Sequence, residues 1–207
     1  MIDIPFDMAS LYLFLNAFAL LFSVLNVVGN APIFLTLTVT LKKDRRRIAT
    51  YSVIIALIIL LIFAYIGLTV FQFLGITIND FKIAGGIILF IVAFQHLMGK
   101  FTGVTKPDAE EIAAFPLATP LLAGPGAIST VIIISSPPYN YLLATAAILL
   151  NCLIAWVALL RSELIYQFLG SSGTKVLTRI MGLLIAAIAI SFIRDGIEAV
   201  VMEMIKI

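Results

Sequence analysis

Two long hydrophobic runs in this chain are each interrupted by residues that break helices. The first run covers residues 11–41 and is interrupted at residues 26–32, and the second covers residues 113–134 and is interrupted at residues 119–126. A helix that breaks inside a membrane leaves backbone N–H and C=O groups without partners, which is costly in hydrocarbon. Such a break persists only where it is buried in protein or lines a polar cavity. Matching breaks in two halves of a chain therefore point to a binding site between them.

The composition indicates an integral membrane protein. Of the 207 residues, 62% are hydrophobic and 12% are charged, whereas a soluble domain is about half apolar and about a quarter charged. The single cysteine, Cys152, excludes an intrachain disulfide. No Asp or Glu lies near the centre of a predicted span, which argues against a metal site and against catalysis by paired carboxylates. We therefore expect no enzyme, no cofactor and no nucleic-acid partner.

Six segments are long and apolar enough to be predicted as membrane spans, since one span needs about 20 apolar residues. They are residues 9–40, 48–72, 82–99, 113–136, 141–160 and 175–194. The basic stretch 42–47 is the strongest orientation signal and is predicted to be cytoplasmic. With six spans, both termini are then predicted to lie outside the cell. The other basic residues on the predicted cytoplasmic side are Lys100, Lys106, Arg161, Lys175 and Arg179.

The two halves of the chain repeat the same order of features. A five-residue motif occurs twice, as Phe-Gln-Phe-Leu-Gly at residues 71–75 and as Tyr-Gln-Phe-Leu-Gly at residues 166–170. The two copies are predicted to close the second and fifth spans. They lie about 95 residues apart, and so do the two broken runs. Because each half has three spans, the second half is predicted to lie upside down relative to the first. The predicted fold is therefore all-α membrane, with six transmembrane helices in two inverted three-helix repeats, residues 1–100 and 101–207, and the first helix of each repeat broken.

The breaks themselves suit a small zwitterion. The start of a half-helix presents free N–H groups and a positive dipole end, which favour a carboxylate. Pro32 and Pro125 are predicted in the first turns of such half-helices. Free carbonyls at the end of a half-helix favour an ammonium group or a cation. The alternative is that the Gly and Pro residues only permit a kink and close helix contact.

A few polar and aromatic residues outside the breaks also carry expectations. Asn16 and Asn151 are expected to join helices by hydrogen bonds, and Trp156 is expected to pack between helices. His96 is the only histidine, so it is a candidate for proton coupling. The alternative for His96 is a hydrogen-bonded residue near the membrane interface.

Two segments resemble the signatures of the MarC family. Residues 26–34 resemble its Asn-Pro-x-Gly-Asn-x-Pro-x-Phe segment, with Val27 in place of the usual proline. Residues 116–130 are similar to its Pro-Leu-x-x-Pro-x-x-x-Gly-Pro-Gly-x-Ile run. The resemblance implies six spans, a LysE-like membrane fold, and proton-coupled transport of small neutral amino acids such as glycine and alanine. The family's substrate contacts would then fall near Asn26, Gly29, Asn30, Thr119, Gly124, Pro125, Gly126 and Ser129.

Three hypotheses for function follow. The first is a secondary transporter in the cytoplasmic membrane that holds a zwitterionic amino acid between its two broken helices. The second is an exporter of amino acids or other small metabolites. The third is a membrane scaffold without a substrate, for which changes at the breaks would alter only stability.

Overall fold

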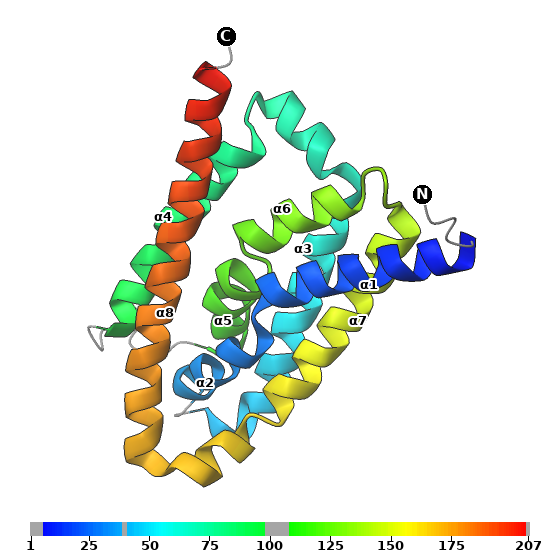
Figure 1. Ribbon diagram of the computed structural model, residues 1–207. Coiled ribbons are helices and arrows are strands. Elements are labelled where there is room, and N and C mark those ends of the chain that lie inside the picture. Colours follow the sequence, from blue (N-terminus) through cyan, green and yellow to red (C-terminus); the bar gives the residue numbers. More distant parts are fainter. Residues whose placement is uncertain (1–5, 39–40, 98–107, 206–207) are drawn as a thin grey trace.

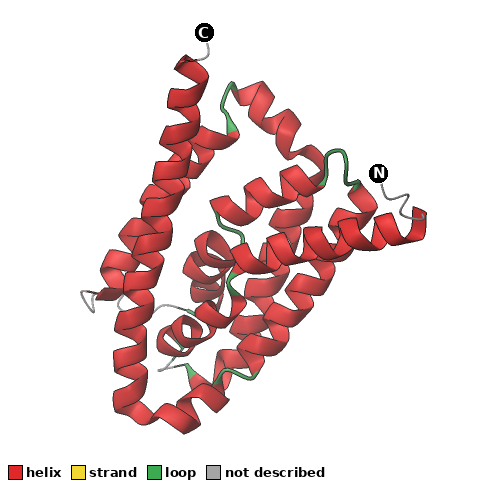
Figure 2. Cartoon of the chain, viewed as in Figure 1, coloured by secondary structure: helices red, strands yellow, loops and turns green. Residues whose placement is uncertain are grey.

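The computed structural model describes residues 6–38, 41–97 and 108–205, and all regular structure within them is helical (Figure 2). Of the residues discussed above, Lys100 and Lys106 lie outside these ranges, and the side chains of His96 and Lys175 are also outside the described part. In chain order the elements are α1 (Phe6–Leu25), α2 (Val27–Leu37), the short 3₁₀ turn η1 (Lys42–Asp44), α3 (Arg45–Leu74), α4 (Ile78–Leu97), α5 (Ala109–Ile112), the π-helical segment η2 (Ala113–Leu122), α6 (Pro125–Ile134), α7 (Tyr141–Leu160) and α8 (Glu163–Ile205).

Three stretches of the described chain are long and apolar enough to cross a membrane. They are Met8–Leu35, Lys42–Leu74 and Tyr141–Leu160, and the bent pair Ala109–Leu122 and Pro125–Ile134 makes a fourth if it is one broken span. The described part of the predicted third span lies in α4, and its residues 98–99 lie outside the described residues. The predicted sixth span falls within α8, and neither α4 nor α8 is among these stretches. The all-helical membrane class is therefore confirmed, while the arrangement of six inverted spans stays a prediction.

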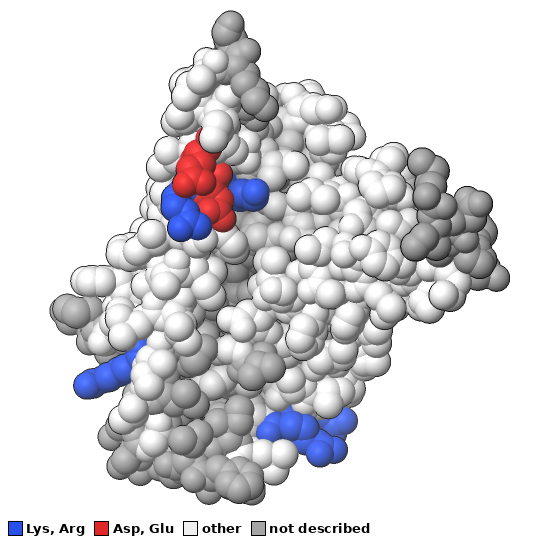
Figure 3. Space-filling model, in the orientation of Figure 1, with Lys and Arg blue, Asp and Glu red and all other residues white. Residues whose placement is uncertain are grey.

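The helices pack as pairs that run across the two halves of the chain. Helix α4 lies along α8, and α3 lies along α7, while α1 crosses α7 and also packs against α6 (Figure 1). Many large apolar side chains remain exposed on the outside, among them Phe73 and Leu142. Over its described residues, the face seen in Figure 3 carries charged side chains in a few small groups separated by wide uncharged areas. Such an outer surface suits contact with lipid rather than water, because water disfavours large exposed apolar patches.

Polar side chains hold the helices together, and three of these contacts involve residues singled out in the sequence. The amide of Asn151 on α7 donates to the Phe18 carbonyl on α1, at 3.3 Å. Trp156, also on α7, donates from its indole nitrogen to Thr50 Oγ1 on α3, at 3.0 Å. The Tyr139 hydroxyl donates to Asn16 Oδ1 at 2.6 Å. The contacts of Asn151 and Trp156 confirm their predicted roles between helices, and hydrogen bonds of this kind hold helices together in membranes. Asn16 on α1 instead bonds the loop that precedes α7.

One predicted helix end is wrong. Residues 166–170 were predicted to close the fifth span, but α7 ends at Leu160 and these residues lie inside α8. The last turn of α7 closes where the Arg161 N–H donates to the Val157 carbonyl and the Ser162 hydroxyl donates to the Leu159 carbonyl. The matching segment does end α3, because Gly75 adopts a left-handed conformation with φ of 67° and its N–H donates to the Gln72 carbonyl.

Candidate functional site

The first break is a single residue. Helix α1 ends at Leu25, Asn26 has a φ of 44°, and α2 begins at Val27. Among residues other than glycine, asparagine is one of the few that adopt this left-handed conformation readily. The predicted position of Pro32 in the first turn of a half-helix is therefore wrong, because Pro32 lies in the interior of α2. The left-handed backbone at Asn26, rather than the proline, changes the direction of the chain.

Gly29 leaves room for the side chain of Asn26. A Cβ atom at Gly29 would lie 2.5 Å from Asn26 Nδ2 and 2.8 Å from its Cγ, too close for any real contact. The carboxamide of Asn26 therefore rests against the backbone of Gly29. Within the described residues no hydrogen bond joins that carboxamide to a partner, so it is free to meet a ligand.

The second break is longer and ends at the start of α6. Phe115 and Thr119 are non-helical within η2, Gly124 is extended, and α6 begins at Pro125 with a bend of 57° between the two helical pieces. The predicted first-turn position of Pro125 is confirmed. The N–H groups in the first turn of a helix have no acceptor inside it, so those of Gly126 and Ala127 face out of the start of α6.

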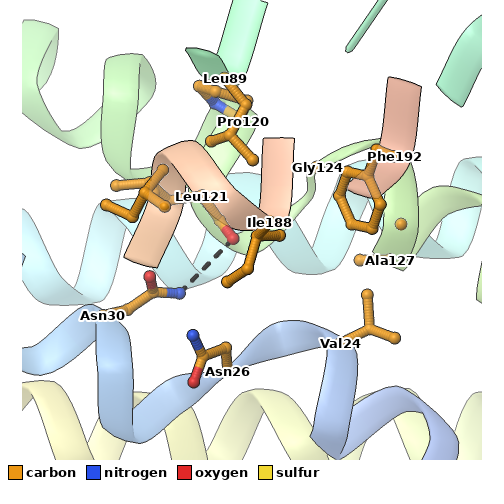
Figure 4. Close-up of a pocket in the computed structure, with 12 residues that line it drawn as sticks. Val24, Asn26, Asn30, Leu89, Pro120, Leu121, Gly124, Ala127, Ile188 and Phe192 are labelled. Carbon is orange, nitrogen blue, oxygen red and sulfur yellow. Dashed lines mark hydrogen bonds between the residues drawn. The ribbon is translucent and has the colours of Figure 1, made fainter. Parts of the chain in front are cut away.

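The two breaks meet at Asn30, a residue that is only 5% exposed. Its Nδ2 donates to the Leu25 carbonyl at 2.9 Å and, more weakly, to the Leu121 carbonyl at 3.5 Å (Figure 4). One of these carbonyls lies at the end of α1 and the other lies in η2, 91 residues away from Asn30. A single amide nitrogen thus satisfies a carbonyl at each break, which reduces the cost of interrupting both helices in an apolar setting.

A cavity opens where the breaks meet. Its empty space, counted with the part that opens to the outside, is about 400 Å³. Figure 4 shows the amide nitrogen of Asn26 pointing from the first break toward Ile188, and that of Asn30 pointing toward the Leu121 carbonyl. None of the described lining residues is ionisable, so among them carboxamides and backbone groups supply the polarity. The lining residues are Val24, Asn26, Asn30, Leu89, Pro120, Leu121, Gly124, Gly126, Ala127, Ile185, Ile188 and Phe192.

Four of the eight residues predicted for the site line this cavity, namely Asn26, Asn30, Gly124 and Gly126. The other four lie beside it. Gly29 supports Asn26, and Pro125 packs against Gly85 of α4. The Thr119 hydroxyl donates to the Ala114 carbonyl, and the Ser129 hydroxyl donates to the Pro125 carbonyl.

The apolar wall of the cavity was not found from the sequence. It is made largely by Leu89 of α4 and by Ile185, Ile188 and Phe192 of α8. These residues belong to uniformly apolar runs, so nothing in the sequence distinguishes them from residues that face lipid. The offset of about 95 residues between α4 and α8 is the one signal that could have placed both helices at the same site.

The fold and the cavity together define an integral membrane protein with two broken helices that meet at an uncharged cavity. A family model for the MarC family of integral membrane proteins matches residues 11–201, and the chain belongs to that family. The chain is 39% identical over 196 residues to a UPF0056 membrane protein of Methanocaldococcus jannaschii, covering 89% of this chain and 96% of that protein. It is also 34% identical over 191 residues to the UPF0056 inner membrane protein YhgN of Escherichia coli K12, covering 89% of this chain and 95% of YhgN. No solved structure matches this chain.

The left-handed conformation of Asn26 gives a stability prediction. We expect Asn26→Gly to keep the free energy of unfolding within about 0.5 kcal/mol of wild type, because glycine adopts a positive φ without strain. We expect Asn26→Val to lower it by about 2 kcal/mol, because a β-branched residue is strained there. Unfolding of the purified protein in mixed micelles by added denaturing detergent measures both values. Equal stabilities for the two variants would show that residue 26 does not need a left-handed backbone.

Proposed function

We propose that this protein is a secondary transporter of small neutral amino acids, such as glycine and alanine, and that the cavity between the two breaks holds the substrate. The observation that carries the proposal is the contact of Asn30 with a carbonyl at each break, since it places both breaks at one cavity. Broken helices that meet in this way form the substrate sites of many transporters.

The polar groups of the cavity match the two charged ends of a zwitterion. The start of α6 offers the first-turn N–H groups of Gly126 and Ala127 and a positive dipole end to the substrate carboxylate. The carbonyl of Leu121 is an acceptor for the ammonium group. The apolar wall and the absence of side chains at Gly124 and Gly126 favour a substrate with a very small side chain.

We propose further that six spans form two inverted repeats, residues 1–100 and 101–207. This arrangement is supported by the packing of α3 on α7 and of α4 on α8, which are the corresponding helices of the two halves. In this arrangement α4 and α8 supply the third and sixth spans, residues 42–47 face the cytoplasm, and both termini lie outside. The two halves would rock around the fixed cavity to expose it to each side in turn.

The transport proposal is tested with purified protein reconstituted into liposomes. Liposomes loaded with unlabelled glycine should accumulate labelled glycine by exchange, and unlabelled alanine should compete. Opposite glycine gradients in separate samples distinguish uptake from export. Uptake that is unchanged after the proton gradient is collapsed would rule out the proton coupling that the family resemblance implies. No exchange of any small neutral amino acid by folded protein would overturn the proposal.

A further inference from the structure

A second cavity lies at the opposite end of α3 and α7 from the loops at Gly75 and Tyr139, and basic residues surround it. Its empty space, counted with the part open to the outside, is about 580 Å³. Lys42, Lys43, Arg45 and Arg46 line it, and Glu163 is the one acidic side chain among the described lining residues. The cavity lies where the apolar stretch Lys42–Leu74 begins, at the predicted boundary between cytoplasm and membrane.

Most of the positive charge at this second cavity is uncompensated. Arg45 is held in place, because its Nη1 lies 2.7 Å from Glu163 Oε1 and its Nε donates to the Thr38 hydroxyl at 3.1 Å. This pair uses the one acidic side chain of the lining. Lys42, Lys43 and Arg46 are exposed, and within the described chain no ion pair joins them to an acidic residue. The cavity therefore attracts an anion.

An apolar groove continues from the second cavity along the same two helices. Arg46 on α3 and Leu160 on α7 line the basic cavity, and Thr50 and Trp156, one turn further along each helix, line the groove. The Thr50 hydroxyl donates to the Arg46 carbonyl at 2.9 Å, so the cavity and the groove share this turn of α3. The rest of the groove is formed by the apolar side chains Val53, Ile54, Leu57, Leu149, Cys152 and Leu153.

The length of the groove fits one leaflet of a bilayer. From Arg46 to Leu57 the helix rises roughly 16 Å at about 1.5 Å per residue, and half of a hydrocarbon core is about 15 Å thick. The groove starts at the charged boundary and runs toward the middle of the membrane. An acyl chain attached to a headgroup in the basic cavity would follow the same path.

We propose that the basic cavity and the groove between α3 and α7 form a binding site for an anionic phospholipid. The headgroup phosphate is held by Lys42, Lys43 and Arg46, and one acyl chain lies against Ile54, Leu153 and Leu149. Because Arg45 and Glu163 join the two halves of the chain beside the headgroup, a bound lipid would contact both halves. This site is separate from the substrate cavity, so it stands whether or not the chain transports amino acids.

The first test compares lipid binding to purified protein by native mass spectrometry, with phosphatidylglycerol and phosphatidylcholine of identical acyl chains. We expect phosphatidylglycerol to bind more tightly. The variant Lys42→Gln/Arg46→Gln should bind it roughly 30-fold more weakly, since each basic residue at an anionic surface strengthens association about fivefold. The matched control Lys82→Gln/Arg179→Gln removes two basic residues outside the cavity. Its affinity for phosphatidylglycerol should stay within about twofold of the wild-type value. Equal binding of the two lipids by wild type, or equal losses in the two variants, would overturn the proposal.

The second test separates a lipid from a free anion. Inorganic phosphate at millimolar concentration should not displace phosphatidylglycerol from wild type, because it cannot use the groove. Ile54→Trp, which fills the groove, should weaken phosphatidylglycerol binding at least tenfold, whereas Ile58→Trp, on an exposed position of α3 outside the groove, should not. Displacement by phosphate alone would show a simple anion site, and equal effects of the two tryptophans would show that the groove holds no acyl chain.

Discussion

The variant Gly126→Val is expected to lose glycine and alanine binding, with affinity falling at least 100-fold. Gly126 lies in the first turn of α6 and lines the cavity between the breaks. A Cβ atom there would run into the ring of Phe192 and would lie 2.7 Å from Val24 Cγ1. A valine side chain would therefore fill the space between α1, α6 and α8 and cover the N–H groups proposed to bind the carboxylate. Retention of labelled glycine and a thermal shift with added glycine measure the loss.

Controls must separate a filled cavity from a damaged fold. Overpacking of this kind costs about 1–3 kcal/mol of stability, so unfolding curves accompany each binding measurement. Ala146→Val makes a similar change at an exposed position of α7 that does not line the cavity, and it should bind like wild type. The Phe192 ring is the nearest neighbour of a Cβ atom added at Gly126. The double variant Gly126→Ala/Phe192→Leu makes this neighbour smaller, so it should bind glycine more tightly than Gly126→Ala alone. Wild-type binding by folded Gly126→Val would show that the substrate lies elsewhere.

The positions of the breaks could be predicted because hydrocarbon makes them so costly. Asparagine, glycine and proline within apolar runs have few uses in a membrane other than to interrupt a helix at a cavity. The sequence also predicted correctly that Pro125 begins a half-helix, because proline is well suited to a first turn. The same reasoning misplaced the start of α2, because Asn26 breaks the helix through its own left-handed backbone and Pro32 is tolerated inside α2.

The contacts at the site could not be predicted to the same extent. That Asn30 bonds carbonyls at both breaks depends on how α2 lies against η2, which no local pattern encodes. Phe192 and Ile188 form the opposite wall, yet they look like any other apolar residue in a chain that is 62% hydrophobic. The repeated five-residue motif at residues 166–170 gave a wrong prediction of a helix end for a related reason. A shared motif fixes a helix end only when the backbone adopts the capping conformation, as Gly75 does.

A change at the second break should have the largest effect on stability. Gly124 is extended, and a Cβ atom there would lie in direct conflict with the backbone carbonyl oxygen of Pro120. That carbonyl is part of a tight loop in which the Ala123 N–H donates to the Ala118 carbonyl at 2.7 Å. Asn30 also holds the neighbouring Leu121 carbonyl. Because backbone cannot swing aside as a flexible side chain can, we expect Gly124→Ala to lower the free energy of unfolding by about 3 kcal/mol or more.

The same substitution at Gly182 provides the matched control for Gly124→Ala. Gly182 lies inside α8, where the nearest atoms to an added Cβ are Cδ2 and Cγ of Leu97, at 3.1 and 3.2 Å. These belong to a flexible side chain, and alanine is favoured over glycine in a helix interior by about 1 kcal/mol. Gly182→Ala should therefore leave the stability unchanged or raise it slightly. Denaturing-detergent unfolding of the two variants side by side measures the difference. Equal stability would mean that the Pro120–Gly124 loop is loose enough to yield, and a loose loop could not hold the start of α6 in position for a substrate carboxylate.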